Sequence, residues 1–271
     1  MKVVIHNYLL GMLILLPIAC TETEYDDNYN ILTTPLQLRV LTYNIGDFSG
    51  SDFENGSPEG AIIIRNALSE QKASIIGLQE DVEGYGNGKP DIIYSSYPYY
   101  YRTGNSIYNY KSFASIWPIY NIGQVYYSGG YFDHPYFLTG ELFLNNHKRL
   151  LLVSFHFDWA DKNRRHSQIQ QLISFSKDYE LAVLMGDTNC DNYLEGILID
   201  RELLYEDEWG IFLDSGYSLA NGGAFGLMPT YGNSPLDNIF VSSSIEIQNA
   251  FVAKYDYMND HYMMVADLYI K

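Results

Sequence analysis

The sequence predicts an α/β protein in which β-sheets are sandwiched together and helices lie outside them. Segments with the pattern of strands outnumber those with the pattern of helices, and the two kinds are mixed along the chain. The chain has 271 residues, 47% of them hydrophobic, which is enough to bury a full core. Residues 36–271 contain no repeat and no low-complexity linker, so one large domain is the simplest assignment.

Hydrophobic patterning places most of the predicted strands. Residues 37–44 alternate between apolar and polar side chains, as a strand with one buried face does. Residues 84–135 are rich in Tyr, Gly, Asn and Ser, and we expect loops and short strands there without placing each one. The other predicted strands are short apolar runs at 74–79, 149–156, 181–186, 236–242 and 262–270.

Helical spacing of apolar residues occurs in two segments, 58–72 and 162–179. For the first helix, Ser57 is a suitable capping residue and Pro58 occupies the first turn. In the second, Ile169 and Leu172 fall on one face. Both helices are therefore expected to cover a sheet with one apolar side.

The N-terminus has the pattern of an export signal. An apolar stretch follows Lys2 and is too short to span a bilayer, which takes about 20 residues, but it suits a secretory signal at 1–19. The run Leu16-Pro17-Ile18-Ala19-Cys20 resembles a bacterial lipobox, whose cysteine becomes the lipid-modified first residue of the mature protein.

This resemblance predicts an exported bacterial lipoprotein at the outer membrane or the cell surface. Cys20 would anchor the chain in the membrane, and residues 20–35 would form an acidic tether. Pro17 is atypical for a lipobox, so a plain signal peptide followed by an incidental cysteine remains the alternative.

Charge and cysteine content narrow the classes of partner. Lys and Arg total 16 against 33 Asp and Glu, a net charge of −17, which disfavours a general electrostatic grip on long nucleic acid. Cys20 and Cys190 are the only cysteines, so a thiolate zinc site is excluded, and lipidation of Cys20 would leave no intramolecular disulfide. No protein partner can be inferred from the sequence.

Polar residues stand at the ends of the predicted strands, where they can meet in one cleft. Hydrolysis of a phosphate ester needs a cation, a base for water and hydrogen-bond donors to the phosphoryl oxygens. Carboxylates and amides suit a hard Mg²⁺ or Mn²⁺ ion, and histidines suit the base and the acid. The polar residues at strand ends are Asn44, Gln79, Glu80, His156, Asp158, Asp187, Asn189, Asp237 and the run Asn259-Asp260-His261.

Five of these strings, in order along the chain, resemble the signature of the endonuclease/exonuclease/phosphatase superfamily, which has the fold of DNase I. The resemblance extends over nearly the whole mature chain and implies a four-layer α/β/β/α sandwich and a metal-dependent phosphoesterase. The strings are Leu41-Thr42-Tyr43-Asn44, Ile76-Gly77-Leu78-Gln79-Glu80, Gly186-Asp187-Thr188-Asn189, Leu236-Asp237-Asn238-Ile239-Phe240-Val241-Ser242 and Asn259-Asp260-His261-Tyr262.

The resemblance implies a metal site and a phosphate site. Glu80 would be the principal ligand of Mg²⁺ or Mn²⁺, with Asn44 beside it touching metal or phosphate. Asp260 would serve the metal site or the hydrogen-bond network around it. Asn189 would hold a phosphoryl oxygen, and His156 would donate a hydrogen bond or a proton on the phosphate side.

The resemblance also implies how water is activated. His261 would be the general base and Asp237 would orient it. Asp187 would orient the attacking water or help to activate it.

The sequence departs from the family pattern at two positions. Asn238 stands where many members have His or Tyr, which alters the packing around the Asp237–His261 pair. Gly46 stands where some members carry a second acidic ligand, and Asp47 could replace that ligand only if the loop differs. One-metal chemistry is therefore favoured.

Each site residue also has a purely structural interpretation. Asn44 and Asn189 could cap turns, Asp187 could be a turn residue, Glu80 could be solvated at a strand end, and His156 could be a core histidine. Asp158, Cys190 and the histidines without motif support are interpreted as structural or surface residues; those histidines are His134, His147 and His166.

The substrate is left open, because one fold can host many phosphoesterase activities. Scarce basic residues favour a small phosphodiester, a phosphomonoester or a lipid head group over a long duplex. A secreted nuclease acting on DNA or RNA and a non-catalytic surface-binding lipoprotein remain the alternatives. The nearest basic candidates for a substrate rim are Arg102, Lys111, Arg164 and Arg165.

Overall fold

The computed structural model describes residues 29–46, 58–81, 96–103, 110–129, 134–145, 147–190, 193–194, 197–198, 208–255 and 260–271. The predicted signal peptide, Cys20, Asp47, Ser57 and Asn259 lie outside the described residues. None of the helices in the described part is long and apolar enough to cross a membrane.

The described residues form two large sheets. The seven-stranded sheet has the order β1-β7-β8-β9-β13-β12, with β6 also paired to β7, and the six-stranded sheet has the order β14-β15-β2-β3-β5-β4. The strands of the first are β1 (Ile31–Leu32), β6 (Tyr120–Tyr126), β7 (Tyr136–Leu144), β8 (Arg149–His156), β9 (Leu181–Asp187), β12 (Tyr217–Leu219) and β13 (Asp237–Ser242). Those of the second are β2 (Leu36–Asn44), β3 (Ile75–Gln79), β4 (Tyr99–Thr103), β5 (Lys111–Ser115), β14 (Ile245–Ala253) and β15 (Met263–Ile270).

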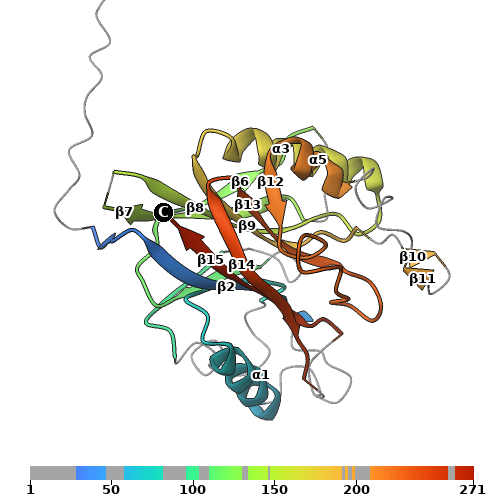
Figure 1. Cartoon of the computed structure of the whole chain (residues 1–271). Coiled ribbons are helices and arrows are strands. Elements are labelled where there is room, and N and C mark those ends of the chain that lie inside the picture. Colours follow the sequence, from blue (N-terminus) through green and yellow to red (C-terminus); the bar gives the residue numbers. More distant parts are fainter. Residues whose placement is uncertain are drawn as a thin grey trace, which may run out of the picture.

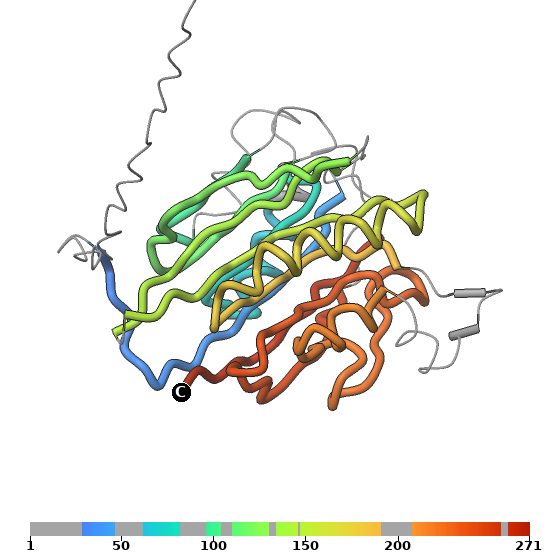
Figure 2. The backbone as a smooth tube through the Cα atoms, turned by 90° about the horizontal axis from the view of Figure 1, so that it is seen from above, coloured from blue at the N-terminus to red at the C-terminus, as the bar shows by residue number. Residues whose placement is uncertain are grey.

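Helices cover the outer face of each sheet (Figure 1). They are α1 (Pro58–Gln71), α3 (Lys162–Ser176) and α5 (Glu208–Asp214), and a separate two-stranded pair is formed by β10 (Tyr193–Leu194) and β11 (Ile197–Leu198). Apolar side chains of α1 pack on the six-stranded sheet, and those of α3 and α5 pack on the seven-stranded sheet. Figure 2 shows α3, in yellow, lying along the strands that it covers. The predicted four-layer α/β/β/α sandwich is confirmed.

The core between the sheets follows from strand alternation. In β2, Leu38 and Val40 face the other sheet, while Leu41 and Tyr43 face α1. In β8, Leu150 and Leu152 face inward and Phe155 faces the α3 side. The two sheets approach closely at Gly77, where an added Cβ would lie 2.6 Å from Met185 Cγ.

The predicted strands and helices are present with shifted ends. Residues 149–156 form β8 as expected, and 37–44 form β2, which begins one residue earlier. Helix α1 ends at Gln71, and α3 ends at Ser176 rather than at 179. Asp161 caps α3, because its carboxylate accepts hydrogen bonds from the backbone N–H groups of Asn163 and Arg164.

Strand β7 was not predicted, although all nine of its residues are buried. Its apolar run is interrupted by Thr139, Gly140 and Glu141, which mask the strand pattern. Hydrogen bonds from Asn121, Arg149 and Tyr179 compensate for the burial of the Glu141 carboxylate. Such tertiary compensation cannot be seen in a single sequence.

The folded part of the chain extends into the segment assigned to the tether. Strand β1 pairs in parallel with β7, and the ring of Tyr29 lies 4.3 Å from that of Phe143. At the other end, Ile270 pairs with Leu36, so the last strand lies beside the start of β2 (Figure 2).

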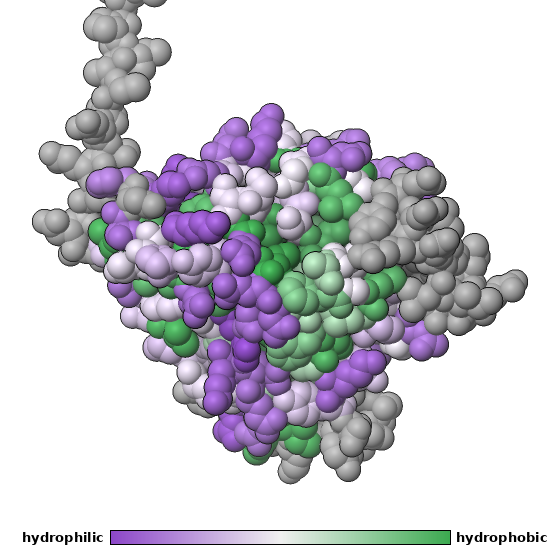
Figure 3. All heavy atoms as spheres, viewed as in Figure 1, coloured by the Kyte–Doolittle hydropathy of each residue, from purple (hydrophilic) through white to green (hydrophobic). Residues whose placement is uncertain are grey.

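On the face seen in Figure 1, hydrophilic residues are interleaved with smaller hydrophobic areas (Figure 3).

Candidate functional site

The inward-facing rows of both sheets become polar at one end of the sandwich. In β2, the row that contains Leu38 and Val40 continues to Asn44, and in β9 the row that contains Val183 and Met185 continues to Asp187. Register then places neighbouring residues at the same level: His156 and Asp237 are both Cα partners of Asp187. The site therefore lies between the sheets, directly beyond the apolar core.

A layer of hydrogen bonds separates the core from the site. Gln79 accepts a hydrogen bond from the hydroxyl of Thr42 at 3.2 Å and donates one across the sheets to Ser154 Oγ at 3.0 Å. The Ser154 hydroxyl donates to the carbonyl oxygen of Leu78 at 3.1 Å. All three side chains are buried, so this layer fixes how the two sheets meet beneath the site.

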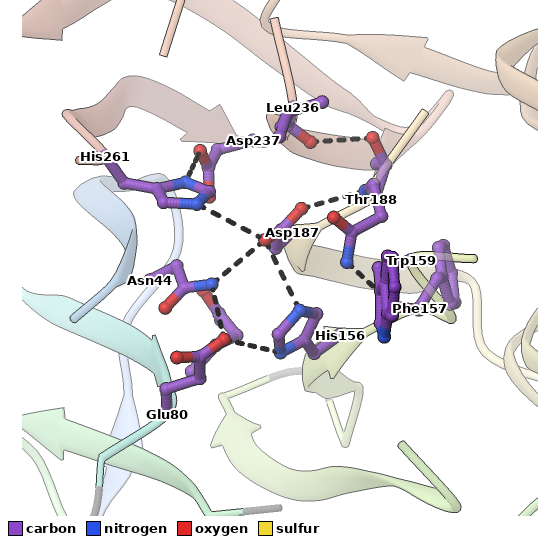
Figure 4. A network of polar contacts seen from close by, with 12 residues as sticks. Asn44, Glu80, His156, Phe157, Trp159, Asp187, Thr188, Leu236, Asp237 and His261 are labelled. Carbon is purple, nitrogen blue, oxygen red and sulfur yellow. Dashed lines mark hydrogen bonds and ion pairs between the residues drawn. The ribbon is translucent and has the colours of Figure 1, made fainter. Parts of the chain in front are cut away.

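Asp187 is the centre of the site (Figure 4). Its Oδ2 atom accepts a hydrogen bond from Asn44 Nδ2 at 3.0 Å and lies 3.4 Å from His156 Nε2 and 3.7 Å from His261 Nε2. Its Oδ1 atom accepts from the backbone N–H of Asn189 at 2.8 Å. One buried carboxylate thus joins groups from four separate motifs.

His261 is held by a second buried carboxylate. His261 Nδ1 and Asp237 Oδ2 lie 2.8 Å apart, and both side chains are buried. When Nδ1–H donates to Asp237, the lone pair of Nε2 is directed to the Asp187 side of the site. This geometry is that of an oriented base.

Asn44 links Asp187 to Glu80. Its Nδ2 atom also donates to Glu80 Oε1 at 3.1 Å, and its Oδ1 accepts from the backbone N–H of Gly46 at 3.0 Å. Glu80 has a φ of 54°, a left-handed conformation that costs free energy for a residue with a side chain. The backbone therefore turns sharply at the residue predicted to bind the metal, and Glu80 Oε1 lies 3.8 Å from His156 Nδ1.

Asn189 and Asp260 lie at the border of this network. Asn189 Nδ2 donates to the carbonyl oxygen of Phe157 at 2.9 Å, and the residue has a φ of 49°. Its turn-forming interpretation is thus seen directly, while the second N–H of the amide is available to a ligand. Asp260 is exposed, and its charge raises the pKa of both Glu80 and His261, so it lies at the open side of the site.

Two residues of the site were missed by the sequence reasoning. His134, assigned to surface or packing, is buried with its ring stacked on that of His156 at 3.5 Å. Lys111, placed on the substrate rim, is instead fully buried, with its Nζ 4.4 Å from the centre of the Tyr136 ring. Lys111 is the Cα partner of Gln79 in β5, which brings it next to Glu80. No motif surrounds either residue: strand pairing brings Lys111 to the site, and ring stacking brings His134 there.

Burial and neighbouring charges shift the pKa values of the site's titratable groups, raising some and lowering others. Burial raises the pKa of Glu80, and burial together with the charge of Asp237 raises the pKa of Asp187 to about 7. Burial lowers the pKa of Lys111 to about 7 and holds that of His156 below its usual range, assisted by the charges of His134 and Lys111. For His261, burial opposes protonation, but Asp237, Asp187 and Asp260 outweigh it and raise its pKa to about 10.

This donor set fits a divalent cation. Among the described residues, ligand atoms of Asp187, Asp237 and His261 lie within 4.8 Å of one another. In the same part of the chain, the buried Asp237 Oδ1 has no hydrogen-bond partner. Glu80 adds a third carboxylate, linked to Asp187 through Asn44, so carboxylate oxygens dominate and a hard ion such as Mg²⁺ or Mn²⁺ suits them.

Both departures from the family pattern have a structural explanation. Asn238 pairs with the backbone of Asn221, accepting from its N–H at 2.8 Å and donating to its carbonyl at 3.0 Å. It thereby anchors the segment that follows β12 and leads to β13, while Asp237, its neighbour in β13, keeps its contact with His261. Gly46 adopts a φ of 54° and supplies an N–H to Asn44, so position 46 contributes no acidic ligand.

The remaining basic and acidic candidates have structural roles. Asp158 is fully buried and accepts hydrogen bonds from two backbone N–H groups of its own loop and from Arg164 at 3.3 Å. Arg165 is paired with the buried Glu208 at 2.9 Å, which joins α3 to α5. Arg164 and Arg165, which were expected at a substrate rim, form ion pairs with Asp158 and Glu208. Cys190 is a buried thiol packed on the α3 side of the seven-stranded sheet.

Comparison with known proteins identifies the fold. No family model matches the sequence, and no curated protein matches it. Among solved structures, an endonuclease/exonuclease/phosphatase family protein from Bacteroides thetaiotaomicron aligns with a TM-score of 0.63 at 17% identity, over 88% of this chain and 99% of that chain. The architecture is thus that of the DNase I-like endonuclease/exonuclease/phosphatase fold.

Two other similar structures carry names that state more about them. TDP2 from D. rerio, described as complexed with a single strand DNA product, aligns with a TM-score of 0.61 at 14% identity, over 86% of this chain and 98% of that chain. A mannosyl-6-phosphatase from Bacteroides thetaiotaomicron aligns with a TM-score of 0.60 at 16% identity, over 85% of this chain and 99% of that chain. At these identities the likeness establishes the fold alone.

Proposed function

We propose that this protein is a divalent-metal-dependent phosphoesterase that hydrolyses a phosphodiester or a phosphomonoester by in-line attack of water. The observation that carries the proposal is the arrangement around Asp187. On one side of Asp187 lies His261, which the buried carboxylate of Asp237 orients. On the other side lies Glu80, which the side-chain amide of Asn44 links to Asp187.

The base side of the site would activate water. The carboxylates around His261 raise its pKa to about 10, so the base is the neutral fraction of His261. Its Nε2 takes a proton from the attacking water while Nδ1–H stays hydrogen-bonded to Asp237, which stabilises the imidazolium that forms. Asp187, 3.7 Å from Nε2, orients the water toward phosphorus. As the water oxygen bonds to phosphorus, the bond from phosphorus to the ester oxygen breaks, the leaving alkoxide takes a proton from solvent water, and His261 then returns its accepted proton to the solvent.

The opposite side would hold the phosphoryl group. Glu80, with Asn44 beside it and Asp260 at the open side, would hold Mg²⁺ or Mn²⁺, which offsets negative charge on the phosphoryl and leaving oxygens. His156 is directed at Asp187 and Glu80 and would donate to a phosphoryl oxygen, as would the second amide N–H of Asn189. His134 keeps the His156 ring in place by stacking.

The proposal is tested by the activity of the purified full-length chain against phosphomonoesters, phosphodiesters, sphingomyelin, DNA and RNA, with Mg²⁺, with Mn²⁺ or with EDTA. Hydrolysis of at least one small ester, lost in EDTA and in His261→Ala, supports it. Hydrolysis that EDTA leaves untouched contradicts the metal mechanism. Absence of hydrolysis across the panel favours the non-catalytic binding protein.

Nucleic acids belong in that panel, because one of the similar structures is described with a DNA product. Degradation of DNA or RNA at rates above those of small esters would overturn the preference for a small substrate and favour the nuclease alternative. That preference rests on the net charge of −17 and on the pairing of Arg165 away from solvent.

A further inference from the structure

Trp159 is exposed beside the candidate site on a loop that is held in place. The protein has three tryptophans, and Trp159 is the exposed one, at 68%, whereas Trp209 is buried and Trp117 is partly buried. Among the described residues, the Trp159 ring takes part in no ring contact. Exposure of an indole to water is unfavourable, so packing a ligand against it lowers the free energy.

The position of Trp159 is fixed relative to the site. It is three residues beyond His156, so their Cα atoms lie within about 11 Å of each other. Between them, Phe157 is held at both backbone groups, since its N–H donates to Asp187 O at 3.0 Å and its carbonyl accepts from Asn189 Nδ2 at 2.9 Å. Figure 4 shows Trp159 next to Phe157 at the edge of the network.

Hydrogen bonds of Asp158 and Trp159 also hold the loop in place. Asp158, fully buried, accepts from the N–H groups of Ala160 and Asp161, and its own N–H donates to Gln168 Oε1 at 2.8 Å. Arg165 donates to the carbonyl oxygen of Trp159 at 3.3 Å. The indole is therefore presented by a rigid backbone, which lowers the entropy lost when a ligand packs on it.

We propose that Trp159 is a specificity-determining residue whose indole stacks on a ring in the organic part of the phosphoester. This inference rests on the proposed function and names its substrate class: an ester that carries a nucleobase, an aryl group or a sugar ring close to phosphorus. A π face attracts flat rings and the C–H faces of sugars without requiring charge, which suits an acidic protein with few cationic side chains.

The test compares ring-bearing with ringless esters. For the full-length chain with Mg²⁺, we expect Trp159→Ala to lower the ratio of kcat/KM for phenyl phosphate to that for methyl phosphate about tenfold, through KM. Trp159→Phe keeps most of the ratio, because it retains a ring. Ile116→Ala is the control, since Ile116 is an exposed apolar residue, at 43%, next to the end of β5 far from Lys111. An unchanged ratio in Trp159→Ala overturns the proposal.

A binding measurement separates this proposal from the proposed function. In the His261→Ala background, tryptophan fluorescence is titrated with adenosine monophosphate, glucose 6-phosphate, phenyl phosphate and methyl phosphate. We expect ring-bearing ligands to change the emission and Trp159→Phe to remove that change, even if no ester is hydrolysed. The stronger of the adenosine and glucose responses identifies a base or a sugar. Equal responses to methyl and phenyl phosphate, no response to any ligand, or a response that survives Trp159→Phe contradict stacking.

Discussion

The carboxylate of Asp187 receives contacts from both sheets, so the chemistry of the site depends on how single residues are placed around it. Asn44 and Glu80 come from the six-stranded sheet and its margin, while His156 and Asp237 come from the seven-stranded one. A shift of either sheet would separate His261, which precedes β15 in the six-stranded sheet, from Asp237 in the seven-stranded one.

Asp237 gives the most specific prediction at this scale. We expect Asp237→Asn to lower kcat/KM about 100-fold or more, because an amide cannot stabilise the imidazolium of His261 through the 2.8 Å contact. Hydrolysis of a nitrophenyl phosphodiester measures this. Asp178→Asn, at an exposed site after α3, is the control and keeps wild-type activity. Wild-type kcat/KM in Asp237→Asn would show that His261 does not act as an oriented base.

The motifs in the sequence predicted the site residues at the strand ends, but they did not predict that Lys111 and His134 belong to the site. Glu80, Asp187 and His261 have neighbours in sequence that mark them, and the structure brings them together. Lys111 and His134 reach the site only because β5 pairs with β3 and because one ring stacks on another. Those are long-range contacts, which no local pattern encodes.

At the scale of elements, Gly186 shows why a motif residue is glycine. An added Cβ would lie 2.0 Å from the carbonyl oxygen of Phe155, so β8 and β9 could not keep their register beside Asp187. We expect Gly186→Ala to lower the free energy of unfolding by about 2–3 kcal/mol, measured by urea denaturation. Gly123→Ala in β6 is the matched control, since its nearest atom, Thr139 Oγ1, lies at 3.4 Å. Equal stability of the two variants would contradict this packing.

The pairing of β2 with β15 gives a pH-dependent prediction. Two hydrogen bonds from Arg39 hold the pKa of Asp267 below its usual value, so the pair stabilises the fold above the unfolded carboxyl pKa of about 4 and the stabilisation is lost as pH falls. The pair is partly solvated, which limits Asp267→Asn to a loss of about 1 kcal/mol at neutral pH. Urea unfolding should show this difference disappearing in acid. A difference that grows in acid would contradict the assignment.

Strand and helix patterns predicted the elements that carry the motifs and missed those whose pattern is broken. β8 matched its predicted residues, whereas β7 was hidden by the polar residues inside it. The 84–135 segment holds β4, β5 and β6 in its described parts, and their short, tyrosine-rich sequences have no clear period. Pairing with β3 and β7 defines these strands.

At the scale of the whole molecule, the folded domain follows an N-terminal segment predicted to direct export. We propose that Cys20 is lipidated and holds the domain at a bacterial membrane. In the native host, labelled fatty acid should enter the wild-type chain and the Cys190→Ala variant but not Cys20→Ala, because Cys20 and Cys190 are the only cysteines. Equal labelling of Cys20→Ala would favour the plain signal peptide.

The central claim at this scale is that acidic groups from both sheets form a metal-dependent hydrolytic site. Its most direct test is the rate of phosphoester hydrolysis by the full-length chain as Mg²⁺ or Mn²⁺ is titrated, compared between wild type and Glu80→Gln. We expect saturable activation of the wild type, loss of activity in EDTA, and a fall of about 100-fold in Glu80→Gln with a higher metal concentration for half-activation. Hydrolysis that is independent of metal, or a Glu80→Gln variant with the wild-type metal response, would contradict the account.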